Sequence, residues 1–388
     1  MTNKILFCAT MDYHFKAFHL PYMSWFKEQG WEVHVAANGQ MELPYVDKKF
    51  DIPIQRSPFK LQNLEVYYRL KTIIDDNQYD MIHCHTPMGG VLARLAARKA
   101  RKRGTKVLYT AHGFHFCQGA SYINWLMYYP IEKMLSRYTD CLITINNEDY
   151  NLAVNHRFGA DRIDLVHGVG VSTERFKPVG EQERILSRKR LGYTPDEFLM
   201  FYAAEFNKNK NQQLLIHALA LIQDQVPHAR LLLAGEGTLQ EKCRELAAEL
   251  GVAEKVEFLG YRKDISLLLP LCDVAVASSL REGLPVNIME AMACGLPVIA
   301  SANRGHSELI EDAVNGYIVN GQNRGEFAAR MVELSKSRDL CAKMGMESMN
   351  RMRQYSITQV GLELAGIYSH YFSGDGNETK SKYSGAYI

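Results

Sequence analysis

The chain has 388 residues, of which 47% are hydrophobic and 23% charged, and its formal net charge is +2. This length exceeds that of one ordinary domain and indicates two or three, and the composition is that of a globular protein. The charge balance excludes an overall polycation, so no nucleic-acid partner is expected. No apolar stretch approaches the roughly 20 residues of a membrane-spanning helix.

The cysteines and the N-terminus both favour a cytoplasmic protein. The eight cysteines form no C-x-x-C pair, and most lie in apolar segments. This pattern predicts buried, reduced thiols. The first 15 residues carry one lysine and a short apolar run before charged and aromatic residues, which is typical of a β-strand and not of a signal peptide.

Short apolar runs alternate with amphipathic stretches through the first half of the chain. Such alternation predicts a parallel sheet with helices on both faces. The expected strands are 4–9, 32–37, 81–85, 106–111, 142–145 and 163–166, and the expected helices are 18–29, 64–77 and 91–103.

The second half repeats this pattern, and we therefore predict an α/β protein with two Rossmann-like, doubly wound domains that face a cleft. The boundaries are an N-terminal domain at 1–177, a C-terminal domain at 178–355, a helix at 356–372 that packs back on the N-terminal domain, and a disordered tail at 373–388. Sheets of this kind bind ligands outside the carboxyl ends of their strands, so the cleft between the domains is the expected site.

The segment 278–301, SSLREGLPVNIMEAMACGLPVIAS, carries the most specific chemical signal. Glu282 lies in a loop after a predicted strand, and Pro285 suits the first turn of a helix that holds Glu290. Gly295 fits the position just after that helix. The N-terminus of such a helix offers N–H groups and a partial positive charge to a diphosphate. A carboxylate one or two turns along can accept both hydroxyls of a ribose.

In this context, S-x-x-x-E-G-x-P and E-A-M-A-x-G-x-P-V-I-A-S, the E-x7-E spacing of Glu282 and Glu290 resembles the retaining GT-B glycosyltransferases. That large family includes bacterial exopolysaccharide, capsule and mannosyl transferases, and the resemblance covers nearly the whole chain. It implies a nucleotide sugar bound mainly by the C-terminal domain and an acceptor bound by the N-terminal domain. Glu282 would lie beside the donor sugar and Glu290 would hold the ribose, with Gly283 and Leu284 in the same donor-binding loop.

The resemblance also assigns residues outside this segment. The stretch AAEFNKNKN at 203–211 aligns with the family's G-R-L-x-x-x-K-G, so Lys210 matches the lysine that neutralises the donor diphosphate. The family's arginine is replaced by Glu205, and Lys208 would supply the missing charge. Three further donor-binding positions, in the domain-crossing segment and the base-binding turn, are Gly170, Tyr261 and Arg262.

Two predicted loops of the N-terminal domain are expected to contribute site residues. His112 follows the strand 106–111 and matches the family's histidine near the donor sugar, so we expect it to act in catalysis. The first loop, 11–19, lacks the Gly-Gly of many relatives and is aromatic and basic. This character resembles transferases of bacterial surface-polysaccharide pathways, which often act on lipid-linked diphosphates. Lys16, His14 and His19 are the expected acceptor contacts.

No metal site and no cofactor are predicted. His83 and His85 point to the same face of a strand, but no third ligand is evident. The chain also lacks the D-x-D motif of metal-dependent transferases. Cations and helix ends must then neutralise the leaving nucleoside diphosphate.

Two segments leave membrane contact open. Residues 98–106 hold six basic side chains and no acid, and 114–138 is rich in aromatic residues. Basic and aromatic character together suit an anionic bilayer surface. The alternative to membrane contact is that the basic residues lie at an ordinary exposed helix end and that the aromatic residues belong to a helix packed in the core.

We therefore expect a retaining glycosyltransferase that uses a UDP-sugar, with an N-acetylhexosamine or a hexose as the sugar. Its acceptor would be a glycan or an undecaprenyl-diphosphate-linked sugar in surface-polysaccharide synthesis at the inner face of the membrane. Two alternatives stay open: a non-hydrolysing sugar-nucleotide epimerase, and a non-catalytic sugar-nucleotide-binding partner of a membrane enzyme, which Glu205 would favour. Acceptor-dependent release of nucleoside diphosphate separates the three.

Overall fold

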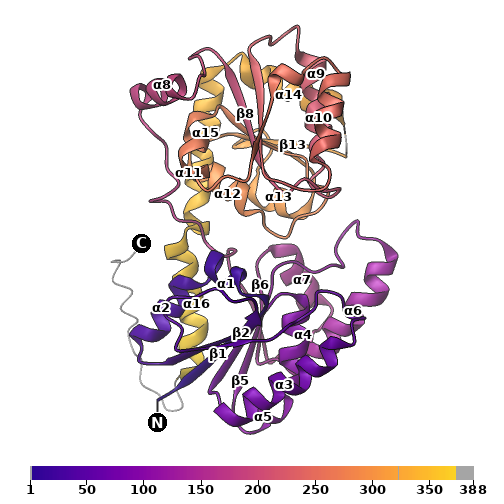
Figure 1. The fold of residues 1–388 in the computed structure, drawn as a ribbon, viewed down its shortest axis with the longest axis vertical. Helices are drawn as coiled ribbons and strands as arrows, with labels where there is room; N and C mark the ends of the chain where they lie inside the picture. The colour runs from indigo at the N-terminus through magenta and orange to yellow at the C-terminus, as the bar shows by residue number, and fades with distance from the viewer. Residues whose placement is uncertain (1, 322, 373–388) are drawn as a thin grey trace. The chain divides into compact units, whose positions relative to one another are not determined.

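The computed structural model describes residues 2–321 and 323–372, and the chain forms two α/β units (Figure 1). One unit comprises the chain up to Gly170 together with the segment that begins at Val360, and the other extends from Val171 to Gln359. The boundary lies before the predicted one at 177/178, because Val171 already bonds within the second unit. Its N–H donates to the carbonyl of Tyr355 at 3.0 Å. The predicted tail at 373–388 lies outside the described residues.

The N-terminal unit is built on a seven-stranded parallel sheet. All six strands predicted in this half are present, whereas the strand at 48–51 was missed because KKFD contains no apolar run. The strands are β1 (Lys4–Met11), β2 (Glu32–Asn38), β3 (Lys48–Asp51), β4 (Met81–His85), β5 (Lys106–Ala111), β6 (Cys141–Thr144) and β7 (Arg162–Leu165), in the order β3-β2-β1-β4-β5-β6-β7.

Helices cover both faces of this sheet (Figure 1). The predicted helix at 91–103 is divided at Ala97 into two helices. The helices are α1 (Tyr13–Phe18), α2 (Leu20–Glu28), α3 (Gln62–Asn77), α4 (Pro87–Ala96), α5 (Arg98–Lys102), α6 (Tyr122–Ser136), α7 (Asn147–Asn155) and α16 (Ile357–Phe372).

Strand β1 shows why the strands are apolar throughout. Leu6 packs in the core formed with α3 and α4, whereas Phe7 packs in the core formed with α2 and α16. Both residues are fully buried, as expected for a parallel strand covered on each face. The contribution of α16 to the second core includes Leu364 and Tyr368, so the C-terminal helix is part of the N-terminal unit's core.

The C-terminal unit has a six-stranded parallel sheet in the order β10-β9-β8-β11-β12-β13. Its strands are β8 (Phe198–Ala203), β9 (Ala229–Ala234), β10 (Val256–Gly260), β11 (Val274–Ala277), β12 (Val298–Ser301) and β13 (Gly316–Val319), and its helices are α8 (Glu181–Arg190), α9 (Gln212–Ile222), α10 (Gln240–Glu249), α11 (Ile265–Leu268), α12 (Val286–Ala293), α13 (Arg304–Leu309), α14 (Arg324–Ser335) and α15 (Arg338–Met352).

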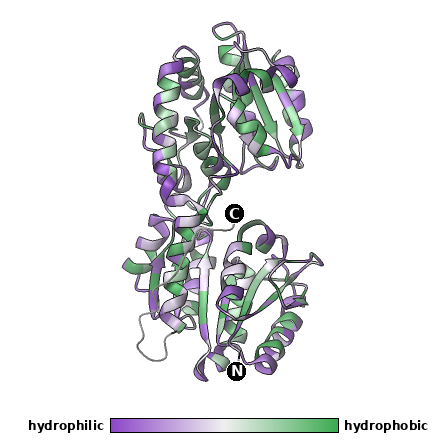
Figure 2. Cartoon of the chain, turned by 90° about the vertical axis from the view of Figure 1, so that its left-hand side faces the viewer, coloured by the Kyte–Doolittle hydropathy of each residue, from purple (hydrophilic) through white to green (hydrophobic). Residues whose placement is uncertain are grey.

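Hydrophobic residues concentrate along the strands of each unit, and the helices carry hydrophobic and hydrophilic residues on different sides (Figure 2). All eight cysteines are free thiols, and all but Cys341 are buried. Within the described ranges, no helix is both long enough and apolar enough to cross a bilayer.

Each sheet has one point at which the strand order reverses. In the N-terminal unit this switch lies between β1 and β4, and in the C-terminal unit it lies between β8 and β11. Open parallel sheets bind ligands in the crevice beyond the carboxyl ends of their strands at such a point. The loops after these four strands are therefore the places to look for a site.

Candidate functional sites in the two units

Lys210 and Glu282 meet at the switch point of the C-terminal unit. Lys210 lies in the loop after β8, and Glu282 lies in the loop after the neighbouring strand β11. The lysine ammonium is 2.5 Å from a carboxylate oxygen of Glu282, and both side chains are mostly buried. The two residues that the motif assigns to the donor's reacting end therefore form one ion pair.

Hydrogen bonds hold these two loops together. The Ser278 hydroxyl donates to the carbonyl of Lys210 at 2.8 Å, and the Leu280 N–H donates to the carbonyl of Asn209 at 2.8 Å. The buried hydroxyl of Tyr202 also lies 2.7 Å from that of Ser279. Because these bonds fix the backbone on both sides of the ion pair, little reorganisation is needed when a charged ligand arrives.

Glu290 lies on α12, just over one helix turn after the loop that holds Glu282. The sequence analysis placed Pro285 in the first turn of this helix. In the structure it is the N-cap and so lies one position earlier. Gly295 follows the C-cap with φ of +77°, which confirms its predicted place. Burial raises the pKa of Glu290 to about 7, and the charge of Arg175 opposes part of that rise. At neutral pH this carboxyl therefore holds its proton far more than an exposed glutamate does.

The helix α13 packs directly on the Glu282 loop. A Cβ at Gly305 would lie 2.9 Å from the Cβ of Glu282 and 2.9 Å from the carbonyl oxygen of Gly283, so only glycine permits this approach. Arg304 donates from Nε to the Glu282 carbonyl at 3.1 Å. Asn303 caps the helix and also donates to the Ser279 carbonyl at 2.9 Å. Arg304 therefore contacts the Glu282 loop, although it was not among the predicted site residues.

The other predicted donor-binding residues differ in their surroundings. Leu284 is buried in the same loop as Glu282. Lys208 and Glu205 are exposed in the β8–α9 loop and do not join the Lys210–Glu282 pair. Tyr261 is exposed after β10, and the guanidinium of Arg262 is paired with Asp264 at 2.6 Å.

Two glycines fix the position of the β8–α9 loop. A Cβ at Gly235 would lie 2.1 Å from the carbonyl oxygen of Ala204, and one at Gly237 would lie 2.4 Å from that of Phe206. The Gly-x-Gly after β9 thus has a packing role against the loop that holds Lys210. Gly170 ends the first segment of the N-terminal unit, with φ of +78°, a conformation that favours glycine.

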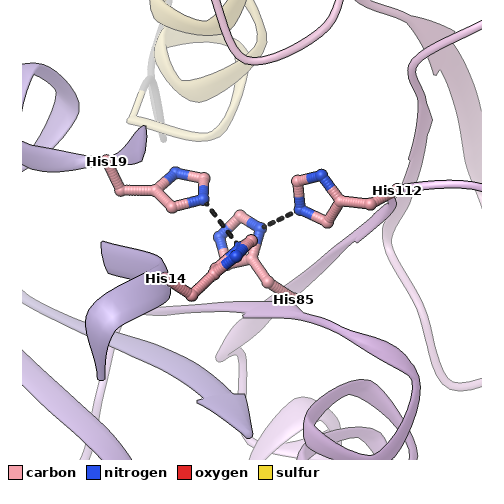
Figure 3. Close-up of side chains that lie close together, drawn as sticks. All are labelled: His14, His19, His85 and His112. Atoms are coloured by element: carbon pink, nitrogen blue, oxygen red, sulfur yellow. Dashed lines mark hydrogen bonds between the residues drawn. The ribbon is translucent and has the colours of Figure 1, made fainter. Parts of the chain in front are cut away.

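Four histidines gather at the switch point of the N-terminal unit (Figure 3). His14 is on α1, His19 precedes α2, His85 ends β4, and His112 directly follows β5. His14 Nε2 lies 3.1 Å from His19 Nε2, and His85 Nδ1 lies 3.3 Å from His112 Nε2. Three of the four were predicted as site residues, whereas His85 was not.

Burial keeps these imidazoles neutral. It lowers the pKa of His14 to about 4 and holds the pKa values of His19, His85 and His112 well below 6.5, with the neighbouring histidines adding to the effect at the last three. Lys16, the third predicted acceptor residue, is exposed on α1 and is not part of the cluster.

A cavity of about 1130 Å³ opens in the N-terminal unit beside His14. Its apolar lining includes one wall from α4, with Met88, Val91 and Leu95 among the lining residues. Its other walls come from β1, the segment before α3, α3 itself, the loop after β5 and α6. Two exposed apolar residues at this cavity are Phe59, 77% exposed, and Leu61, 88% exposed. Basic groups also line it: Arg56, Lys60 and Arg98.

The basic segment 98–106 is partly neutralised. Arg101 pairs with Asp140 at 2.9 Å and with Asp161 at 2.6 Å, and Arg103 pairs with Asp75 at 2.6 Å. These acids come from other parts of the chain, which is why the local sequence showed no counter-charge. Helix α6 leaves Tyr122, Ile123 and Leu126 exposed, so the alternative of a core-packed helix does not hold for its first turns.

Comparison with known proteins agrees with this architecture. Residues 183–351 match the family described as "Glycosyl transferases group 1", and residues 4–146 match "Glycosyl transferase 4-like". The chain is 54% identical over 378 residues to EpsD of Bacillus subtilis (strain 168), which is classed as a glycosyltransferase, and the match covers 97% of this chain and 99% of EpsD.

Two more distant similarities complete the comparison. An Escherichia coli UDP-Gal:alpha-D-GlcNAc-diphosphoundecaprenol alpha-1,3-galactosyltransferase is 26% identical over 284 residues, which is 72% of each chain. The crystal structure of Anabaena HepE in complex with UDP and glucose superposes with a TM-score of 0.77 at 20% identity, over 95% of this chain and 100% of HepE.

Two Rossmann-like units with these family matches define a glycosyltransferase of the GT-B fold. The chain belongs to the group 1, 4-like glycosyltransferase family, and the predicted fold class and enzyme class are confirmed.

Proposed function

We propose that this glycosyltransferase moves a hexose or an N-acetylhexosamine from a UDP-sugar to an undecaprenyl-diphosphate-linked sugar, with retention of the anomeric configuration. The product would be an intermediate of surface-polysaccharide synthesis, made at the inner face of the membrane. A soluble glycan is the other acceptor class that the sequence leaves open.

The observation that carries the proposal is the Lys210–Glu282 ion pair beside the helix that bears Glu290. A UDP-sugar presents a diphosphate, a ribose and a reacting sugar, and these three residues offer one partner to each. Lys210 would bind the diphosphate, Glu290 the ribose hydroxyls and Glu282 the sugar. The first amide groups of α12 lack partners within the helix and would add to the anion site.

The proposed reaction needs no metal ion. The bond between the sugar's C1 and the diphosphate breaks as the acceptor oxygen bonds to C1 on the same face. The acceptor's proton passes to the departing diphosphate oxygen. Lys210 would stabilise the charge that develops there, and exposed Lys208 and partly buried Arg304 are candidates for a second cation where Glu205 replaces the family's arginine. His112 would contact the reacting sugar, as the family resemblance implies.

The cavity of the N-terminal unit supports a lipid-linked acceptor. Its lining combines an apolar wall on α4 with the basic side chains of Arg56, Lys60 and Arg98. A polyprenyl chain requires an apolar wall, and a diphosphate requires basic side chains. The E. coli relative is named for a diphosphoundecaprenol acceptor, which is the same chemical class. His14 lines the cavity, and His19 and Lys16 lie on the adjoining segment.

Exposed apolar residues at the cavity support contact with a membrane surface. Phe59 and Leu61 line the cavity and are mostly exposed, as is Tyr122 on α6. Lys99 and Lys102 on α5 are also exposed and would favour anionic lipids.

The test is a panel of nucleotide sugars incubated with the enzyme, with and without an undecaprenyl-diphosphate sugar, while release of nucleoside diphosphate is measured. The proposal predicts release from one UDP-sugar that depends on the lipid acceptor. Epimerisation of the donor without any acceptor would support the epimerase alternative. Donor binding without turnover on lipid or glycan acceptors would support the non-catalytic alternative.

A further inference from the structure

The four histidines of the N-terminal unit come from separate segments but present their ring nitrogens to one small volume. One ring nitrogen of each of His14, His19, His85 and His112 lies within 4.8 Å of those of the other three (Figure 3). The strand order produces this cluster, since β1, β4 and β5 are neighbours and their carboxyl ends meet at one edge of the sheet.

The nitrogen–nitrogen distances within the cluster fit a shared metal ion. Zinc–imidazole bonds of roughly 2.0–2.1 Å in a tetrahedron place two ligand nitrogens about 3.3 Å apart. His14 Nε2 and His19 Nε2 are 3.1 Å apart, and His85 Nδ1 and His112 Nε2 are 3.3 Å apart. Two edges of the tetrahedron therefore already have the required length, and the remaining pairs of ligand nitrogens lie within 4.8 Å of one another.

Two buried nitrogens in this cluster have no hydrogen-bond partner. They are His19 Nδ1 and His85 Nε2, and both side chains are almost fully buried. They are the second nitrogens of these two rings, since His19 Nε2 and His85 Nδ1 are the atoms whose spacing fits the ion, and each can carry the ring N–H while the first nitrogen binds a metal. A cavity of about 10 Å³ borders His19, His85 and His112, which is about the room that one water molecule or one ion needs.

The neighbouring His83 is excluded from the set of ligands. Its Nδ1 lies 2.9 Å from the Tyr368 hydroxyl and its Nε2 lies 2.8 Å from the Thr110 hydroxyl, so both nitrogens are engaged. His14 and His112 are only partly buried, which leaves a route for an ion from solvent to the buried pair.

We propose that His14, His19, His85 and His112 form a binding site for one divalent transition-metal ion, with Zn²⁺ as the expected occupant. Four neutral imidazoles suit zinc, copper or nickel, whereas Mg²⁺ and Ca²⁺ prefer oxygen ligands. The inference rests on the cluster alone and does not depend on the proposed donor or acceptor. It adds a site to a reaction that needs no metal, and an ion there would occupy the ring nitrogen of His112.

The experiment uses the full chain, freed of metal with a chelator and then titrated with Co²⁺ and, separately, with Zn²⁺. We expect one Co²⁺ per chain with the visible absorption of tetrahedral cobalt and no thiolate-to-cobalt charge-transfer band. Zn²⁺ should displace the cobalt, and Mg²⁺ should not. The variant His14→Ala, at a partly exposed position, should bind at least about tenfold more weakly.

Two further variants keep the result interpretable. His19→Gln should weaken binding in the same way, with circular dichroism used to verify that each variant is folded. His228→Gln, at an exposed histidine of the other unit, is the matched control and should bind as the wild type does. Absence of saturable binding, or equal affinity in His14→Ala, His19→Gln and the wild type, would overturn the proposal, and the cluster would then be a hydrogen-bonded group of neutral imidazoles.

Discussion

The ammonium of Lys210 lies 2.5 Å from a carboxylate oxygen of Glu282, although 71 residues separate them in the chain. The pair exists because β8 and β11 are adjacent parallel strands whose carboxyl ends lie at the same edge of the sheet. It joins the residue expected at the diphosphate to the residue expected at the sugar.

Replacing the lysine should therefore strongly reduce transfer. Lys210→Ala removes the cation beside the leaving group and leaves Glu282 without its partner. We expect kcat/KM for the donor to fall by about 10²–10³-fold, and Lys210→Arg to restore part of the loss. Initial-rate kinetics at varied donor concentration measure this. Lys242→Ala, at an exposed lysine of α10, is the matched control, and a similar rate for Lys210→Ala and this control would contradict the assigned role.

Glu290→Gln should weaken donor binding and stabilise the fold. The amide keeps the size of the side chain but no longer offers two acceptor oxygens to the ribose, so the donor KM should rise at least about tenfold.

Burial has raised the pKa of this carboxyl to about 7, so its ionised form destabilises the native state at higher pH. At pH 8 the variant should gain up to about 3 kcal/mol, and this gain should vanish below about pH 4.5, where both states protonate the wild-type residue. Thermal denaturation at the two pH values tests the second part.

Donor affinity should depend on pH through the same carboxyl. In the free protein Glu290 is largely protonated below pH 7, and the ribose hydroxyls require the ionised form. The Kd for UDP should therefore increase as pH falls from 8 to 6, approaching tenfold per pH unit at the acid end. Calorimetric titration with UDP measures the profile. The Glu290→Gln variant should show a flatter profile, and a wild-type profile as flat as the variant's would count against Glu290 as the ribose partner.

Chelators and zinc should have opposite effects on transfer. Because the proposed reaction relies on Lys210 and helix amides to neutralise the diphosphate, EDTA should leave the rate unchanged or raise it. Added Zn²⁺ should inhibit the wild type by binding the imidazole cluster. A variant with a weakened site, His14→Ala, should need at least about tenfold more Zn²⁺ for half-inhibition of its own rate. Loss of activity in EDTA that Mg²⁺ restores would contradict the metal-independent reaction.

Filling the apolar cavity should weaken binding of the lipid-linked acceptor. Val91→Phe adds a ring to the α4 wall, so the KM for an undecaprenyl-linked acceptor should rise at least about fivefold while UDP affinity stays unchanged. Kinetics with acceptors of long and short prenyl chains measure the effect, which should be smaller for the short chain. Leu221→Phe, at an exposed position of α9, serves as the control. An unchanged KM for the long chain would remove this cavity from the acceptor site.

The sequence was sufficient for the two-unit α/β fold because apolar strands covered on both faces are recognisable as continuous runs. It was also sufficient to single out Lys210, Glu282 and Glu290, since their spacing and turn residues recur in a known motif. It could not predict β3, whose sequence KKFD has no apolar pattern. Nor could it predict the contact of α13 with the Glu282 loop, which depends on the close approach at Gly305.

The histidine cluster was missed for a different reason. The sequence analysis compared His83 with His85 because they are close in the chain. The ring of His85 lies near that of His83, but it also lies near those of His19 and His112, which the order and pairing of β1, β4 and β5 bring together. Strand order is a property of the whole sheet and is not encoded in any local pattern. The same holds for Asp75, Asp140 and Asp161, the acids that neutralise the basic segment.

The measurement that tests the central proposal most directly is the stoichiometry of the full reaction. The enzyme is incubated with its UDP-sugar and an undecaprenyl-diphosphate sugar, and released UDP and extended lipid product are quantified together by mass spectrometry. The account predicts equal amounts of the two, no UDP release without the lipid, and loss of both with Lys210→Ala. UDP release without a glycosylated lipid, or conversion of the donor sugar in the absence of acceptor, would contradict it.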